Sequence, residues 1–151
     1  MPARPGVPGR ACADWVIWIE AFRRGENRPA DHLLALDEAL GGYGELSLVD
    51  RLTEAFAARL DAWHAGLARR LREGTWPVET VLLDARRRLV PLARLAASPL
   101  LPAEVAAQLR EALETLAAAT QRELENAVPK GPGAREFMAQ VRRTPVTVVG
   151  R

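Results

Sequence analysis

Arginine supplies most of the side chains with clear chemical potential in this sequence. Residues 59–94 contain eight Arg and four carboxylates, which gives a local charge of +4. Guanidinium groups bind phosphate through paired hydrogen bonds, and several of them together neutralise several phosphates. The sequence therefore predicts a possible nucleic-acid-binding face. Its candidate residues are Arg69, Arg70, Arg72, Arg86, Arg87, Arg88 and Arg94.

Whether these arginines form one face depends on how two helices meet. If the helices on either side of Gly74 are antiparallel neighbours, Arg69 and Arg70 lie within about 10 Å in height of residues 86–88. Consecutive helical residues point about 100° apart, so three arginines in a row cannot share one side. The alternative interpretation is a solvated surface on which nearby carboxylates pair with some of the arginines.

One pair of residues has a spacing used by metal sites. Asp61 and His64 are three residues apart, which is similar to the Glu-x-x-His pairs of di-iron bundles. Such a site needs two pairs and two further carboxylates, and His32, the other histidine, belongs to no such pair. A metal-binding four-helix-bundle protein is therefore only the second alternative for function, and neither metal ligands nor a cofactor are assigned.

Catalytic groups are sparse. One Cys, two Ser and two His show no spacing that indicates a nucleophile, a base and an orienting group. The glycine-rich stretches 41–44 and 131–133 lack the Lys-Ser/Thr or the preceding strand of a phosphate-binding loop. We expect a non-catalytic protein.

Location is indicated by what the chain does not contain. Cys12 is the single cysteine, so no internal disulfide can form. Residues 1–10 are rich in Pro and Gly without the apolar stretch of a secretion signal. The longest uncharged stretch, 95–103, is nine residues, whereas a membrane span needs about 20. We expect a cytoplasmic protein that does not cross a membrane.

Apolar residues recur every three or four positions along most of the chain, which is typical of helices. Ser47 and Gly74 predict the start and the end of the longest one. Pro91 predicts a kink or a break near Val90. The five consecutive apolar residues 15–19 also suit a strand, but the flanking spacing favours a helix that more than one neighbour must cover. The expected helices cover residues 13–24, 30–40, 47–73, 77–96 and 102–128.

The C-terminal residues 129–151 differ from the rest. They carry five positive and one negative side chain, whereas 1–128 carry 16 and 18. A Pro/Gly linker precedes a short helix at 134–143 and a β-branched end at 144–149, for which the chain offers no second strand. We expect this tail to order on a protein partner or on a second copy. The candidate partner-binding residues are Phe137, Met138, Val141, Arg142, Arg143, Val146 and Val148.

The alternative for the tail is that Phe137, Met138 and Val141 fold the short helix back over the chain's own helices and that the end of the chain frays. In either case the sequence predicts an all-α bundle of about five helices at 12–128, with a flexible arm at 1–11 and a linker and tail at 129–151. We expect a small non-catalytic subunit or adaptor that docks on a larger protein. Nucleic-acid binding by the arginine-rich face is the first alternative.

Overall fold

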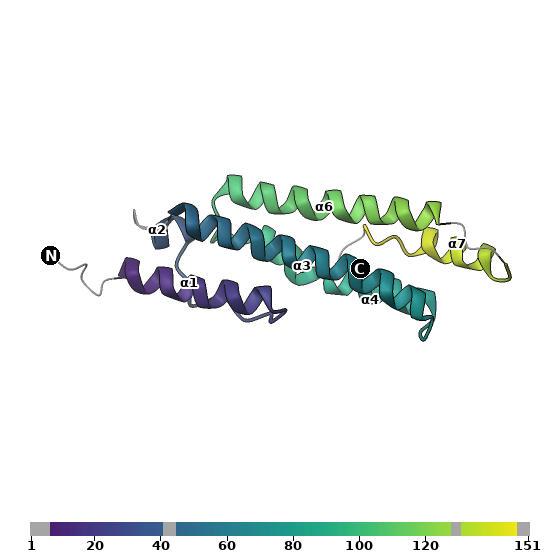
Figure 1. Ribbon diagram of the computed structural model, residues 1–151. Helices are drawn as coiled ribbons and strands as arrows, with labels where there is room; N and C mark the ends of the chain where they lie inside the picture. The colour runs from purple at the N-terminus through teal and green to yellow at the C-terminus, as the bar shows by residue number, and fades with distance from the viewer. Residues whose placement is uncertain (1–6, 41–44, 128–130, 148–151) are drawn as a thin grey trace. The chain divides into compact units, whose positions relative to one another are not determined.

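The computed structural model describes residues 7–40, 45–127 and 131–147. This part of the chain contains seven α-helices and no strand (Figure 1), so the all-α prediction is confirmed. The helices are α1 (Val7–Arg23), α2 (Leu36–Leu40), α3 (Glu45–Glu73), α4 (Val78–Arg88), α5 (Val90–Ala96), α6 (Ala103–Asn126) and α7 (Ala134–Arg143).

The chain divides into two compact units, and neither is a continuous stretch of sequence. The first unit combines Met1–Arg59 with Leu95–Arg110, and the second combines Leu60–Arg94 with Glu111–Arg151. The boundaries lie inside α3, α5 and α6, so each unit contains part of these helices.

Aromatic side chains form the core of the first unit. Trp15, Trp18 and Phe22 of α1 and Phe56 of α3 are all buried. The ring centroids of Trp15 and Trp18 are 5.8 Å apart with an edge contact, and those of Trp18 and Phe22 are 5.3 Å apart and stacked. Phe22 continues the series to Phe56 at 6.4 Å. Aromatic pairs in these arrangements stabilise a core beyond their burial alone.

The run of apolar residues at 15–19 is helical, as its flanking spacing predicts. The helix is not covered on every side, because the side chain of Ile17 is 59% exposed. Helix α1 also begins at Val7 rather than near Ala13. Pro8 does not prevent the earlier start, because the first turn of a helix needs no amide donor at that position.

Helix α1 ends at Arg23, one residue before the predicted end, and Gly25 follows it in the turn. This glycine has a φ of 99°, a left-handed conformation that glycine adopts without steric cost. Its N–H donates to Phe22 O at 2.9 Å, and the N–H of Glu26 donates to Ala21 O at 3.0 Å. This pair of bonds is the Schellman motif, which satisfies carbonyl groups at a helix end.

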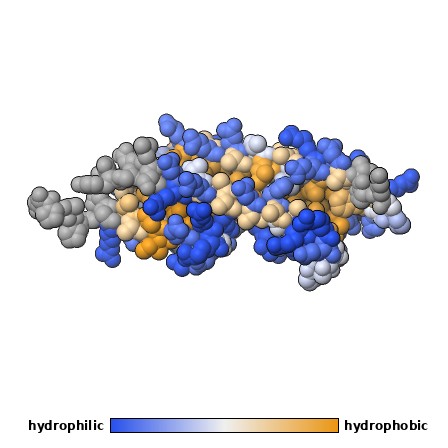
Figure 2. Space-filling view, viewed as in Figure 1, coloured by the Kyte–Doolittle hydropathy of each residue, from blue (hydrophilic) through white to orange (hydrophobic). Residues whose placement is uncertain are grey.

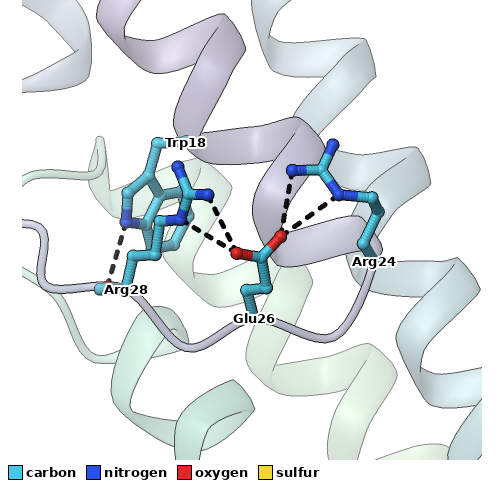
Figure 3. Close-up of polar contacts among 4 residues, drawn as sticks. All are labelled: Trp18, Arg24, Glu26 and Arg28. Atoms are coloured by element: carbon cyan, nitrogen blue, oxygen red, sulfur yellow. Dashed lines mark hydrogen bonds and ion pairs between the residues drawn. The ribbon is translucent and has the colours of Figure 1, made fainter.

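The segment after α1 is held by one carboxylate (Figure 3). Glu26 accepts hydrogen bonds from Arg24 on one oxygen and from Arg28 on the other, each through Nε at 3.1 Å and Nη2 at 2.9 Å. These bonds, that from Arg28 first, hold the pKa of Glu26 below its ordinary value. The carbonyl of Arg28 in turn accepts the indole N–H of Trp18 at 3.1 Å, so this turn is tied to the aromatic core.

The expected helix at 30–40 is wrong for its first half, since α2 contains only Leu36–Leu40. Backbone groups before α2 have tertiary partners in place of helical ones. The carbonyl of Leu34 accepts the indole N–H of Trp15 at 2.9 Å, and the N–H of Leu36 donates to Leu100 O at 2.7 Å. These bonds and the packing of Leu33 and Leu36 in the core favour an irregular segment over a longer helix.

Helix α3 is the long helix that the apolar spacing predicts. It begins at Glu45, so Ser47 lies inside the helix, and the expectation that Ser47 caps it is wrong. The C-terminal end is as expected, because Gly74 has a φ of 64° and its N–H donates to Arg70 O at 3.3 Å.

The second unit has an aliphatic core around one tryptophan. The indole N–H of Trp63 donates to Ala85 O of α4 at 2.9 Å, which sets the register of the two helices in this unit. The predicted break before Pro91 is confirmed, because α4 ends at Arg88, Leu89 forms a turn and α5 begins at Val90. The buried apolar residues of this core are Leu60, Trp63, Leu67, Val81, Leu82, Ala85, Leu89, Leu92, Leu113, Ala117, Leu124, Val141 and Val146.

The burial of Trp63 generates a stability prediction. Replacing Trp63 by Ala leaves a large cavity and removes the donor to Ala85, so we expect a loss of about 3–5 kcal/mol in the free energy of unfolding. Replacing the exposed Trp76 by Ala serves as the control, with an expected change below about 0.5 kcal/mol. Urea denaturation followed by circular dichroism measures both, and equal losses would contradict the assignment of Trp63 to the core.

Candidate protein-docking surface

The C-terminal tail contains the short helix that the sequence predicts. Helix α7 follows Gly133, whose φ of 89° is left-handed, and it packs against α4 in the second unit. After α7 the chain continues as an irregular segment through Thr144 and Pro145 to Thr147. Thr144 and Val146 are buried, so this segment belongs to the core of the second unit.

Gln121 of α6 holds the tail by its backbone. Its Oε1 accepts the N–H of Val146 at 2.9 Å, and its Nε2 donates to Val141 O at 3.2 Å and to Glu125 at 3.1 Å. The side chain is buried, and all its bonding capacity apart from one oxygen lone pair is used. Gln121 therefore recognises two backbone groups of the tail at once.

Arg86 of α4 supplies a second anchor. Its Nε donates to Pro145 O at 2.7 Å, and the residue is only 9% exposed. A charged donor to a backbone carbonyl forms a stronger hydrogen bond than a neutral one. Among the described residues, no buried side-chain nitrogen or oxygen lacks a hydrogen-bond partner.

The structure places the predicted partner-binding residues in three groups. Val141 and Val146 are fully buried within the second unit, which corrects the expectation that they face a partner. Phe137 and Met138 are half-buried, whereas Arg142 and Arg143 are exposed. Val148 lies outside the described residues. The short helix folds back as the alternative predicts, but the expected fraying of the end is wrong for Thr144 and Val146, which are buried. The physical reason is that two polar side chains satisfy the tail's backbone without a sheet edge.

The arginine-rich helices meet as the antiparallel arrangement requires. Asp84 of α4 accepts hydrogen bonds from Arg70 of α3 and from Arg88 one turn further along α4. Desolvation raises the pKa of Asp84, but the hydrogen bonds from Arg88 and Arg70 and their charges outweigh it, so the pKa lies below its ordinary value. The carboxylate therefore stays ionised and neutralises part of the local charge.

The seven candidate nucleic-acid residues consequently do not form one free basic face. Arg70, Arg86 and Arg88 are used by the contacts just described, and Arg69 pairs with Glu73 at 3.8 Å. Of the seven candidates, Arg72, Arg87 and Arg94 are exposed and have no ion pair to the residues that the structure describes.

The histidine of the metal-like pair is used by another contact. His64 Nε2 contacts Glu123 Oε2 of α6 at 3.0 Å, whereas Asp61 is exposed. Across the described ranges no three His, Cys, Asp or Glu side chains converge on a position that could hold a metal ion.

Trp76 is the feature that the sequence analysis missed. The other three tryptophans are buried and donate to backbone carbonyls. Trp76 is 58% exposed and has no hydrogen bond to the described residues. The signal was its position between Gly74, which ends α3, and Pro77, the N-cap of α4. A residue in such a turn lies on neither apolar stripe.

Exposed residues of α4 extend this feature. Leu83 is 41% exposed, and Glu79, Thr80 and Arg87 are exposed at spacings of three and four residues from it. Residues with that spacing are neighbours on one side of a helix. Trp76 lies two residues before α4, and we call Trp76 together with the exposed α4 residues Glu79, Thr80, Leu83 and Arg87 the Trp76 surface. Figure 2 shows one face of the molecule, on which apolar residues in orange lie between hydrophilic residues in blue.

Comparison with protein-family models, with curated proteins and with solved structures finds no match to this chain. No helix in the described ranges has both the length and the apolar character needed to cross a membrane.

The Gln121 anchor generates a prediction about stability. Gln121→Ala leaves the buried Val146 N–H and Val141 O without partners, so we expect a loss of about 1–3 kcal/mol. Gln108→Ala is the matched control, because Gln108 is an exposed glutamine on the same helix. Thermal unfolding of the full chain measures both, and an unchanged melting temperature for Gln121→Ala would contradict the anchor.

The lowered pKa of Asp84 generates a prediction about pH. A carboxylate with a lowered folded-state pKa stabilises the fold above its unfolded-state pKa of about 3.9, and this contribution is lost as the pH falls through the folded-state value. Asp84→Asn should therefore cost about 1 kcal/mol at pH 7 and should remove part of the stability loss below about pH 4. The exposed Asp61→Asn is the control, and urea denaturation from neutral to acid pH is the measurement. Identical pH profiles for Asp84→Asn and the unmodified chain would contradict this role.

Proposed function

We propose that this chain is a non-catalytic helical subunit or adaptor that docks on a larger partner protein through the Trp76 surface. The exposure of Trp76 is the observation that carries the proposal. Burying a tryptophan contributes more apolar area than burying almost any other side chain, and this chain buries its other three. Trp and Arg are also the residue types that most often dominate the energy of protein interfaces.

The Trp76 surface, and not the tail, is the docking surface that we propose. The apolar side chains that would anchor the tail on a partner, Val141 and Val146, are buried in the chain's own core. The tail packs against α4 inside the second unit, because α7 contacts α4 and Arg86 Nε donates a hydrogen bond to Pro145 O. A rigid helix presents side chains to a partner with little loss of conformational entropy.

Nucleic-acid binding is less well supported. Four of its seven candidate arginines make contacts inside the second unit, and binding through phosphates weakens with each cation that is already paired. We also place the protein in the cytoplasm as part of the proposal, since a lone cysteine is compatible with a reducing compartment.

Affinity capture from the native lysate tests the docking function. We expect the tagged full chain to retain a protein partner after nuclease treatment, and Trp76→Ala to lose that partner while the melting temperature stays within a few degrees. Ile17→Ala is the matched control, because it also truncates an exposed apolar residue.

Two results would contradict the proposal. If nuclease treatment releases everything that the tagged chain has captured, the result would favour nucleic-acid binding. Equal capture by the unmodified chain and by Trp76→Ala would remove the Trp76 surface from the interface.

A further inference from the structure

The charges near the Trp76 surface do not cancel. Residues 69–94 contain seven Arg and three carboxylates, which gives +4. Two of the carboxylates are already used, because Glu73 pairs with Arg69 and Asp84 with Arg70 and Arg88. The remaining carboxylate is Glu79, at the N-terminal end of α4, where a negative charge is favoured by the helix dipole.

Excess positive charge therefore lies beside exposed apolar side chains. Arg87 follows Leu83 by four residues, so the two are neighbours one turn apart on the same side of α4. Arg72 lies in the last turn of α3, four residues before Trp76. Neither arginine has an ion pair in the described part of the chain, whereas the nearby Arg70 and Arg88 do. The Trp76 surface thus contains one guanidinium group without an ion pair, that of Arg87, and Arg72 precedes the surface in sequence.

We infer that the partner segment that covers the Trp76 surface is an acidic amphipathic helix. The inference rests on the proposed function and names the chemistry of the partner. The apolar side of such a helix covers Trp76 and Leu83, and carboxylates at its edge pair with Arg72 and Arg87. Opposite charges across an interface raise the association rate and select against wrong partners.

A helix is the appropriate form for the partner segment. The described residues contain no strand, so they offer no sheet edge to which a partner could add an extended segment. The exposed apolar and charged residues follow α4 at spacings of three and four, which matches the ridges and grooves of a second helix. A nucleic acid fits less well, because the apolar side chain of Leu83 would then face phosphates.

Selection from a peptide library tests the inference. The library holds peptides of about 16 residues, enough for four helical turns. Alanine occupies part of each peptide to favour the helix, and the remaining positions are randomised. The full chain is the bait. We expect the enriched peptides to combine apolar residues at spacings of three and four with Glu or Asp at the flanking positions.

Variants then locate the binding of one enriched peptide by fluorescence polarisation. Trp76→Ala should weaken it by about 30-fold, as expected of a residue that dominates an interface. Arg87→Gln should weaken it by about three-fold, with a smaller dependence on salt. Ile17→Ala and Arg110→Gln, at exposed positions of the first unit, should leave the affinity unchanged.

The outcomes separate the inference from the proposed function. Enriched peptides that depend on Trp76 but are neutral or basic, or that ignore Arg87, would overturn the acidic partner and leave docking intact. If no peptide is enriched, or none depends on Trp76, the inference is overturned, and lysate capture decides docking separately.

Other occupants would also overturn the inference. A dimer in light scattering that Trp76→Ala dissolves would identify a second copy. Binding of a single-stranded oligonucleotide that Trp76→Ala abolishes would identify nucleic acid. Iodide quenching of tryptophan fluorescence that Trp76→Phe leaves unchanged would show that the chain covers this surface itself.

Discussion

The indole N–H of tryptophan is the constraint around which both units are organised. A buried tryptophan brings a large apolar ring and a single donor, and that donor needs an acceptor inside the protein. Trp15 and Trp18 find theirs at Leu34 and Arg28, and Trp63 finds its acceptor at Ala85. Each bond joins a helix to a segment that is distant in sequence, so the acceptors decide where the following chain runs.

The long helices could be predicted from the sequence because their cores are periodic. Residues 47–73 repeat apolar side chains every three or four positions and end at a glycine, so local information is sufficient. The segment at 30–40 could not be predicted in the same way. Its carbonyl and N–H groups bond to Trp15 and Leu100, and those partners become neighbours only in the folded unit.

The candidate site was less predictable than the fold. A run of arginines at 86–88 suggests one function, but the helix sends the three side chains to different surroundings: Arg86 to a buried carbonyl, Arg88 to Asp84 and Arg87 to solvent. Gln121 had a recognisable signal, because it is a polar residue at a position where the spacing from Leu113 and Ala117 requires an apolar one. Its partners in the tail could not be read from that signal.

The division of the chain has a consequence for how this protein can change in evolution. Domains are usually separated by exposed linkers, where insertion or recombination leaves each core intact. Here the boundaries at residues 59–60, 94–95 and 110–111 fall inside α3, α5 and α6. A break in the chain at any of these places divides a helix that contributes residues to both units. We therefore expect the two units to be gained and lost together rather than exchanged one at a time.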